Sequence, residues 1–278
     1  MELQWYPGHM TKAKRAMLED IKLVDLVIEV CDARIPLSSR NPDIDDIAGS
    51  KKRIIILNKS DLADERVTSE FSEYFKQKGI FAVPMDARTR EGIRAVTDAI
   101  QTVCREKMER DLKRGIKNRP VRAMVVGIPN SGKSTFINSF CRKASAKTGN
   151  KPGVTKGKQW IHVDKTLDLL DTPGILWPKF SDKSVGINLA ICGSIKDDII
   201  NLEELALILL EKLAESHEEL LLQKYDIKGD DRIEWLSQIA VSRGCIKSGG
   251  EVDISKAAAC VLDDFRKGAI GRITLERV

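Results

Sequence analysis

Short apolar stretches alternate with amphipathic stretches along the first 175 residues of the chain. Residues 26–30, 53–57, 81–85, 124–126 and 167–170 are short and largely apolar, as expected of buried parallel strands. Residues 160–163 precede the last of these and predict a hairpin with it. Residues 11–23, 65–78, 91–113 and 133–142 are expected to be helices. Such alternation is typical of an α/β domain with a doubly wound, mostly parallel sheet.

The pattern changes after residue 178. Asn201 and Glu204 offer a helix N-cap and an acid at the third helical position, and Leu205, Leu209 and Leu213 follow on one face. Residues 233–239 and 257–262 also have helical spacing. We therefore predict two domains, an α/β domain with an N-terminal extension at 1–178 and an all-helical domain at 179–278.

Composition fits a folded protein outside the membrane. Of 278 residues, 42% are hydrophobic and 31% charged. The longest apolar runs are far too short to span a bilayer, and the first residues lack the features of a secretory signal. We expect a cytoplasmic chain with no membrane partner. The six cysteines form no Cys-x-x-Cys pair and are expected to be reduced, packed thiols.

Charge is segregated along the chain, although the formal net charge is only +5. Residues 105–122 hold eight basic and three acidic residues, and residues 142–158 hold six basic residues and no acid. Residues 196–231 are acidic instead. Each run can be a solvated helix face. Two basic runs that flank a nucleotide motif favour an RNA or phosphate-rich partner, because clustered cations gain from counterion release.

That motif is the sequence from Gly127 to Ser134, which matches Gly-x4-Gly-Lys-Ser between a predicted strand and a predicted helix. We expect Lys133 to neutralise the β- and γ-phosphates and Ser134 to ligate Mg²⁺. A glycine-rich turn without a ligand is the alternative. The residues expected to bind the phosphates are Asn130, Ser131, Gly132, Lys133, Ser134 and Thr135.

A second motif, Asp171-Thr-Pro-Gly174, follows the predicted strand at 167–170. Asp171 is expected to hold Mg²⁺ through water, and Gly174 to donate its amide to the γ-phosphate. On its own, Asp-x-x-Gly is a common turn. Between the two motifs lies Thr155, the candidate switch threonine and a further Mg²⁺ ligand.

Guanine recognition is predicted from Asn58, Lys59, Ser60 and Asp61, which directly follow the strand at 53–57. A carboxylate there can accept both the N1–H and the 2-amino hydrogens of guanine, which adenine does not offer. The nucleotide is therefore expected to be GTP or GDP. Asp86 and Ala87, after the next strand, would complete the base pocket through a backbone amide. A surface polar sequence is the alternative for the tetrapeptide.

The order of these motifs is reversed relative to ordinary Ras-like GTPases, in which the phosphate loop comes first. A nucleotide site only needs its loops together at the carboxyl ends of neighbouring strands. We therefore predict a circularly permuted Ras-like P-loop GTPase domain. Because the chain runs from Asp171–Gly174 almost directly into the helical domain, loss of the γ-phosphate is expected to move that domain.

The sequence resembles the YlqF/RbgA family of circularly permuted GTPases, which act in assembly of the large ribosomal subunit. The resemblance rests on residues 5–10, 32–36, 171–178 and 243–250 and on the four nucleotide motifs in permuted order. It implies GTP hydrolysis that a late precursor of the large subunit stimulates and that drives release. It also implies partners among ribosomal RNA and ribosomal proteins, an RNA-binding role for the helical domain at 179–278, and a monomer off the ribosome.

Catalysis needs a group other than the usual glutamine, because Ile175 follows Gly174 and cannot orient water. The resemblance makes His9 the suspected catalytic residue beside Lys133 and Thr155, although His9 can equally pack or contact RNA. Asn130 resembles the asparagine that helps to bind K⁺ in related GTPases. His162 and His217 have no partners at metal-ligand spacing and are expected to be structural.

Two other functions stay open from the sequence. One is a GTP-controlled RNA-binding scaffold in which hydrolysis is incidental. The other is a GTPase of a transfer-RNA modification complex.

Overall fold

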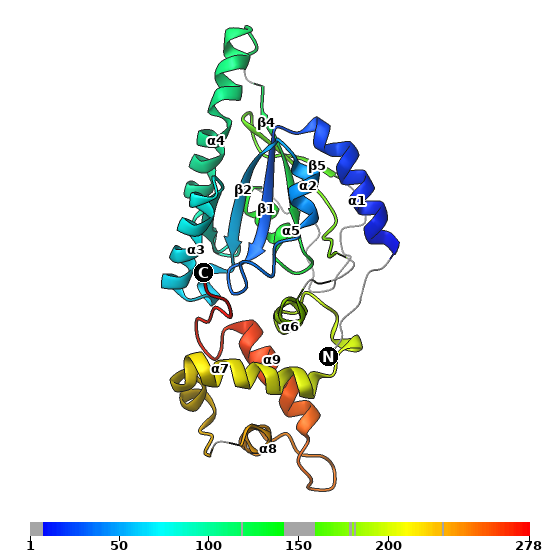
Figure 1. Ribbon diagram of the computed structural model, residues 1–278, viewed down its shortest axis with the longest axis vertical. Coiled ribbons are helices and arrows are strands. Elements are labelled where there is room, and N and C mark those ends of the chain that lie inside the picture. Colours follow the sequence, from blue (N-terminus) through cyan, green and yellow to red (C-terminus); the bar gives the residue numbers. More distant parts are fainter. Residues whose placement is uncertain (1–7, 118, 142–158, 178–179, 181, 230) are drawn as a thin grey trace.

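A computed structural model describes residues 8–117, 119–141, 159–177, 180, 182–229 and 231–278, without the side chains of residues 8–10, 13, 232 and 233 (Figure 1). Among these residues, six strands form one sheet in the order β3-β2-β1-β4-β6-β5. The strands are β1 Leu26–Asp32, β2 Lys52–Asn58, β3 Phe81–Met85, β4 Val121–Gly127, β5 Gln159–His162 and β6 Leu167–Asp171. Each predicted strand is therefore present.

All neighbouring strands are parallel except β5 and β6, which form the predicted hairpin. β1 is central, because it pairs with β2 on one side and β4 on the other. The register aligns the strand ends, with Asp32 beside Asn58 and Val30 beside Gly127. The segments that follow β1, β2 and β4 consequently leave the sheet side by side.

Helices cover both faces of the sheet, as a doubly wound fold requires. Alternate residues of β2 separate the two faces: Ile54 and Ile56 pack under α4 Ile93–Lys113, while Ile55 and Leu57 pack under α3 Glu65–Gln77. α5 Lys133–Phe140 shares the face of α4. α1 Gly8–Asp20 and α2 Asp43–Ala48 contribute buried residues to the opposite face, beside β1 and β4. The predicted fold class is confirmed.

Four helices lie beyond the carboxyl ends of the strands (Figure 1), namely α6 Lys183–Ile191, α7 Leu202–Tyr225, α8 Arg232–Ser242 and α9 Ile254–Lys267. Asn201 caps α7 by accepting hydrogen bonds from the amides of Glu203 and Glu204. Leu205, Leu209 and Leu213 are fully buried, as their spacing predicts. Their cluster also contains Met124 and Leu170 of the sheet, so one apolar core joins the helices to the α/β part. The division of domains after residue 178 stays a prediction.

Two helices escape the sequence pattern. α2 has only six residues, too few to show a period. α6 is apolar around most of its circumference and lies between the sheet and α7, so its sequence carries no polar face. None of the helices that the structure describes is long and apolar enough to cross a membrane. All six cysteines are free, as expected.

Candidate functional site

The four predicted nucleotide motifs lie at one edge of the sheet, where β2, β3, β4 and β6 end. Residues 127–134, called the phosphate loop below, connect β4 to α5. Residues 58–61, the base segment, follow β2 and include the 3-10 helix η2 Ser60–Leu62. Residues 171–174, the switch segment, follow β6. Chain order is thus no obstacle to bringing them together.

Glycine is required at two positions of the phosphate loop. A Cβ on Gly127 would lie 2.6 Å from the backbone oxygen of Val30 in the neighbouring strand. Gly132 has a φ of +89°, and a Cβ there would lie 2.2 Å from Nδ2 of Asn58. The loop therefore packs directly on β1 and on the base segment, and side chains at these positions would push it away.

Asn58 joins the phosphate loop to both base-recognition segments. Its Nδ2 donates to the backbone oxygen of Ser131 at 2.8 Å, and its Oδ1 accepts from the amide of Ala87 at 3.1 Å. The side chain is almost completely buried, so both hydrogen bonds are sheltered from water. The two ends of the predicted site, 73 positions apart in sequence, are held together by this one amide.

Asp61 carries a carboxylate that suits a guanine edge. Its Oδ1 is buried and finds no hydrogen-bond donor among the described residues, while Oδ2 contacts the Arg88 guanidinium. A buried acceptor without a donor is unfavourable, and the N–H groups of guanine would satisfy it. The predicted base contact therefore fits this carboxylate.

Residues 86–88, the second base segment, use their backbone amides for contacts within the protein, which the sequence did not predict. The amide of Ala87 donates a hydrogen bond to Oδ1 of Asn58, and the amide of Arg88 donates to Oδ1 of Asp86 at 2.9 Å. Asp86 also accepts from the Thr89 hydroxyl, so it stabilises its own turn. The expected amide contact from this segment to the guanine carbonyl stays a prediction.

Lys133 and Asp171 bring the phosphate loop and the switch segment together. Lys133 Nζ donates to Oδ1 of Asp171 at 2.7 Å, and both side chains are almost fully buried. Phosphate oxygens would offer the same ammonium an equivalent anionic acceptor. Ser134 follows Lys133 in the first turn of α5, so the predicted Mg²⁺ ligands Ser134 and Asp171 belong to the same corner of the site.

Gly174 lies against the phosphate loop, where a Cβ would be 3.1 Å from the Pro129 nitrogen. The next residue, Ile175, donates its amide to the backbone oxygen of Gly127 at 3.3 Å, and its side chain is buried in the apolar core. The switch segment is thus fixed at its end by a main-chain contact. Ile175 offers no polar group for orienting water, as predicted.

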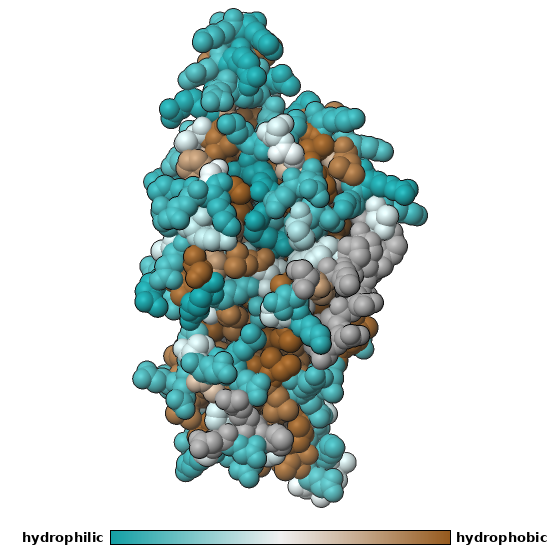
Figure 2. All heavy atoms as spheres, viewed as in Figure 1, coloured by the Kyte–Doolittle hydropathy of each residue, from teal (hydrophilic) through white to brown (hydrophobic). Residues whose placement is uncertain are grey.

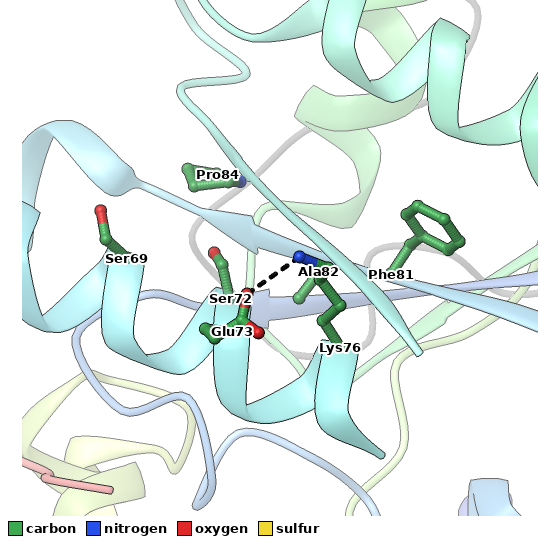
Figure 3. A pocket seen from close by; sticks show the side chains of 7 residues that line it. All are labelled: Ser69, Ser72, Glu73, Lys76, Phe81, Ala82 and Pro84. Carbon is green, nitrogen blue, oxygen red and sulfur yellow. Dashed lines mark hydrogen bonds and ion pairs between the residues drawn. The ribbon is translucent and has the colours of Figure 1, made fainter. Parts of the chain in front are cut away.

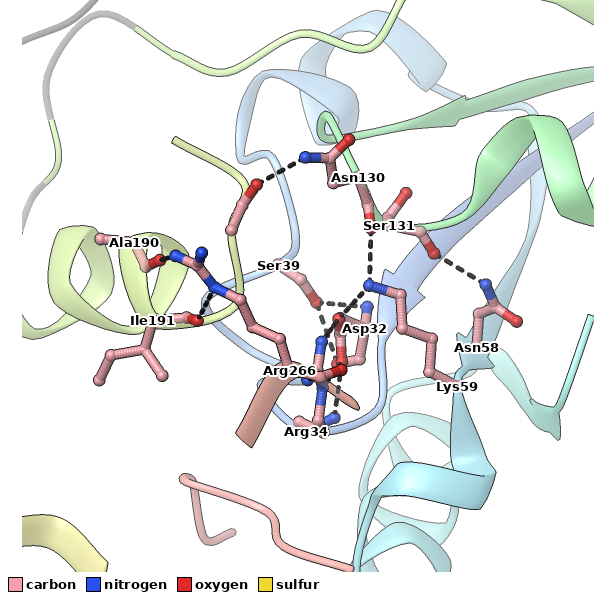
Figure 4. Close-up of polar contacts among 11 residues, drawn as sticks. Asp32, Arg34, Ser39, Asn58, Lys59, Asn130, Ser131, Ala190, Ile191 and Arg266 are labelled. Carbon is pink, nitrogen blue, oxygen red and sulfur yellow. Dashed lines mark hydrogen bonds and ion pairs between the residues drawn. The ribbon is translucent and has the colours of Figure 1, made fainter. Parts of the chain in front are cut away.

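A buried ionic network supports the base segment and the phosphate loop (Figure 4). Asp32 Oδ2 accepts from Arg34 at 2.7 Å and from Lys59 Nζ at 2.8 Å, and Lys59 also donates to the backbone oxygen of Asn130 at 2.7 Å. Burial alone would raise the pKa of Asp32, but Arg34 and Lys59 hold that pKa well below its ordinary value. The network therefore stays ionised at neutral pH.

Residues 32–36 are among those that carry the resemblance, but no sequence motif predicts a role for Asp32 or Arg34. An acid and an arginine directly after a buried strand are the signal that could have pointed to them. Arg34 also donates to the backbone oxygen of Arg266 in α9, at 3.4 Å. The network consequently reaches the C-terminal helices.

Asn130 has a left-handed backbone, with a φ of +61°. Its Nδ2 donates to the backbone oxygen of Gly193 at 2.6 Å, just after α6 (Figure 4). Arg266 of α9 donates to the backbone oxygens of Ala190 and Ile191 in the same turn. The phosphate loop, α6 and α9 are therefore connected by hydrogen bonds.

The remaining predicted residues are less defined. Ser134 and Thr135 are half-buried at the start of α5. Thr155 lies outside the described residues, and His9 lies in the first turn of α1 with a side chain outside them. Within the described ranges, no three His, Cys, Asp or Glu side chains cluster as a metal site. A shallow hollow between α3 and β3 (Figure 3) includes none of the predicted site residues.

Comparisons with known proteins agree with this geometry. The family model described as "50S ribosome-binding GTPase" matches residues 122–233. The protein named ribosome biogenesis GTPase A of Bacillus cereus is 46% identical over 99% of this chain and 94% of its own length. Mitochondrial ribosome-associated GTPase 1 of Mus musculus is 32% identical over 99% and 90%.

Solved structures are similar over nearly the whole chain. GNP-bound YlqF from T. maritima has a TM-score of 0.65 and 28% identity, covering 96% of this chain and 98% of that one. The GDP-bound form has a TM-score of 0.66 and 27% identity, covering 95% and 99%.

Proposed function

The chain belongs to the ribosome biogenesis GTPase A family, and we propose that it acts on a late precursor of the large ribosomal subunit. In this proposal the GTP-bound protein docks on ribosomal RNA and neighbouring ribosomal proteins. The particle stimulates hydrolysis of GTP to GDP and phosphate, and hydrolysis releases the protein. Guanine nucleotide binding is supported by the GNP-bound and GDP-bound relatives.

The observation that carries the proposal is the pair of hydrogen bonds made by Asn58. One joins the base segment to Ser131 of the phosphate loop at 2.8 Å, and the other joins it to Ala87 after β3 at 3.1 Å. The unsatisfied Oδ1 of Asp61 then favours guanosine over adenosine. Together these contacts support a single guanine nucleotide that spans the carboxyl ends of β2 and β4.

Lys133 would exchange Asp171 for the β- and γ-phosphates when the nucleotide binds. Ser134 and Asp171, with Thr155, would hold Mg²⁺, which supplies positive charge to the phosphates. Asn130 would contribute to a K⁺ site, where the ion supplies charge that an arginine finger provides elsewhere. His9 would orient the attacking water, a role that Ile175 cannot perform.

Coupling between hydrolysis and release is supported by contacts around α6. The switch segment leads into α6, and Asn130 holds the turn after α6 through Gly193. Arg266 holds the same turn from α9. A shift of the switch segment on phosphate loss would therefore be passed to α6 and to the helices packed on it.

The far end of the molecule supplies a basic surface for RNA. α4 extends past the amino ends of the strands, away from the nucleotide site (Figure 1), and the side of this end seen in Figure 2 is largely hydrophilic. Most basic side chains here are exposed to solvent, and Lys107 and Arg119 also pair with the buried Asp111. The exposed basic residues are Arg105, Arg110, Lys113, Arg114, Lys117 and Arg119. Such a surface suits an RNA phosphate backbone.

Single-turnover GTP hydrolysis, with and without precursor large subunits, tests the proposal. We expect precursors to accelerate hydrolysis by the wild-type chain at least tenfold, and Lys133→Ala to abolish nucleotide binding. His9→Ala is expected to keep nucleotide binding and lose the acceleration. An RNA-binding scaffold would show no acceleration by precursors. A GTPase of transfer-RNA modification would co-purify with small RNAs and a modifying enzyme.

A further inference from the structure

The base segment is covered by residues 268–276, called the strap below, which follow α9 at the other end of the chain. Arg272 donates from Nε to the backbone oxygen of Ala63 at 2.9 Å and from a terminal nitrogen to that of Ser60 at 3.1 Å. The amide of Ile273 donates to the backbone oxygen of Leu62 at 2.9 Å. The strap thus binds three carbonyl groups in the turn that carries Asp61.

Two further contacts fix the strap in this position. The Thr274 hydroxyl, almost fully buried, accepts from the amide of Asp64 at 3.1 Å. Gly268 packs so closely that a Cβ there would lie 2.6 Å from Cδ2 of Leu62. The strap and η2 are therefore packed and hydrogen-bonded together, although Arg272 and Ser60 are 212 positions apart in sequence.

The strap's own anchor is Glu276. Its carboxylate accepts from the amides of Leu37 and Ser38 and from Nδ2 of Asn188. These donors belong to the loop after β1 and to α6. The strap is consequently anchored at Gly268 and at Glu276, and the half-exposed Arg272 side chain binds the base segment between these two points.

Asp61 needs such support because its own turn is weak. η2 has only three residues and follows Lys59, whose backbone is left-handed with a φ of +60°. Within the turn, the Ser60 oxygen accepts only one hydrogen bond, from the Ala63 amide at 3.3 Å, so it keeps capacity for a second donor. The Arg272 guanidinium supplies that second donor to Ser60 and also binds the oxygen of Ala63, the residue that ends the turn, so its positive charge offsets the partial negative charge of both oxygens.

We propose that Arg272 is a positioning residue for guanine recognition, which holds the Ser60–Leu62 turn so that the Asp61 carboxylate meets the N1–H and 2-amino groups together. This inference rests on the proposed function, because it assumes that the base segment reads guanine. Without Arg272 the turn keeps its sequence but loses its fixed orientation. If the Asp61 carboxylate rotates, we expect it to lose its contact with the 2-amino group, which is at the outer end of the base edge.

The test compares GDP with inosine diphosphate, which lacks the 2-amino group. Equilibrium titration of the full chain gives the ratio of the two dissociation constants. For the wild type we expect GDP to bind about ten- to a hundredfold tighter than inosine diphosphate. For Arg272→Ala the ratio is expected to fall to about two or less. A general loss of protein stability would weaken the binding of both nucleotides equally and leave the ratio of dissociation constants unchanged.

Two further variants complete the test. Arg272→Lys keeps the charge and can reach one carbonyl but not both, so its ratio should lie between those of the wild type and Arg272→Ala. It decides the question alone if the alanine variant does not fold. Arg277→Ala is the matched control, because Arg277 donates hydrogen bonds to strap carbonyls, those of Thr274 and Glu276. Its ratio should equal that of the wild type.

A wild-type ratio in both Arg272 variants overturns this inference. Failure of the proposed function gives a different result, because the wild-type chain itself would then show no preference for GDP over ADP. An Arg277→Ala ratio as low as that of Arg272→Ala would also overturn it, since any disturbance of the strap would then suffice.

Discussion

The Nζ atom of Lys59 lies 2.7 Å from the backbone oxygen of Asn130, 71 positions later in the chain. The base segment, which is predicted to bind the guanine base, therefore also supports the phosphate loop. Lys59 reaches this oxygen while also contacting Asp32, so a buried charge holds the loop in place. In this permuted chain the two motifs form one structural unit.

Asn58→Ala should affect nucleotide binding more than its effect on stability suggests. The change removes two buried hydrogen bonds, which leaves the Ser131 oxygen and the Ala87 amide unpaired and lowers the free energy of unfolding by about 1–3 kcal/mol. We expect GDP affinity to fall at least tenfold by calorimetry. Asn201→Ala is the matched control: loss of this α7 cap costs about 1 kcal/mol but leaves GDP affinity unchanged.

Gly132→Ala should disable the phosphate loop without removing a polar group. The new Cβ would meet Nδ2 of Asn58 at 2.2 Å in a backbone with a φ of +89°. We expect a loss of stability of about 1–3 kcal/mol and no measurable GDP binding. Gly79→Ala has a similar φ of +75° with open space around its Cβ, so it should lose stability but keep GDP binding. Normal binding by Gly132→Ala would contradict the described packing.

Asp32→Asn should change how stability depends on pH. Since Arg34 and Lys59 lower the folded-state pKa of Asp32, its contribution is present above its ordinary value of 3.8 and disappears as pH falls below that value. At pH 7 the variant should be less stable by about 3–5 kcal/mol, because the buried guanidinium of Arg34 and the half-buried ammonium of Lys59 lose their partner. Denaturant titrations should show the difference in free energy of unfolding between the wild type and the variant becoming smaller only below about pH 4. If this stability difference became smaller between pH 7 and 5, titration of Asp32 would not be its cause.

Asn130→Ala should remove any difference between K⁺ and Na⁺. The side chain is the proposed K⁺ ligand and also donates to the Gly193 oxygen, so its loss removes both contacts. We expect wild-type GTP hydrolysis to be faster in K⁺ than in Na⁺ and the variant to hydrolyse GTP equally slowly in both. If the variant kept the K⁺ advantage, Asn130 would not be a ligand.

Charge reversal on α4 should weaken RNA binding and spare the nucleotide site. Arg110→Glu, Lys113→Glu and Arg114→Glu together replace three exposed cations at the end of the molecule that lies away from the phosphate loop. We expect the affinity for precursor ribosomal RNA to fall at least tenfold and the salt dependence of binding to become shallower. GDP affinity should not change. Reversal of three exposed acids of α7, Glu211, Glu215 and Glu218, to lysine should not weaken RNA binding.

The strands and the position of each motif at the end of a strand were predictable from the sequence, because each depends on a few adjacent residues. The strand at Phe81–Met85 has its predicted bounds, and the others differ by a few residues at their ends. The contacts that complete the site are long-range. Asn58 with Ser131, or Arg272 with Ser60, joins residues that no local pattern relates. The strap has no regular secondary structure, so no periodic pattern marked it.

The central position of β1 has a consequence for synthesis of the protein. Leu26 pairs with Lys52, which is made soon afterwards, and with Ala123, which is made much later. While a ribosome translates the intervening segment, one edge of an apolar strand lacks its permanent neighbour. Exposed strand edges are prone to pair with other chains. The permuted order thus leaves this assembly GTPase exposed to wrong strand pairing at β1 during its own translation. In a chain that began at the phosphate loop, a different strand would wait for its neighbour.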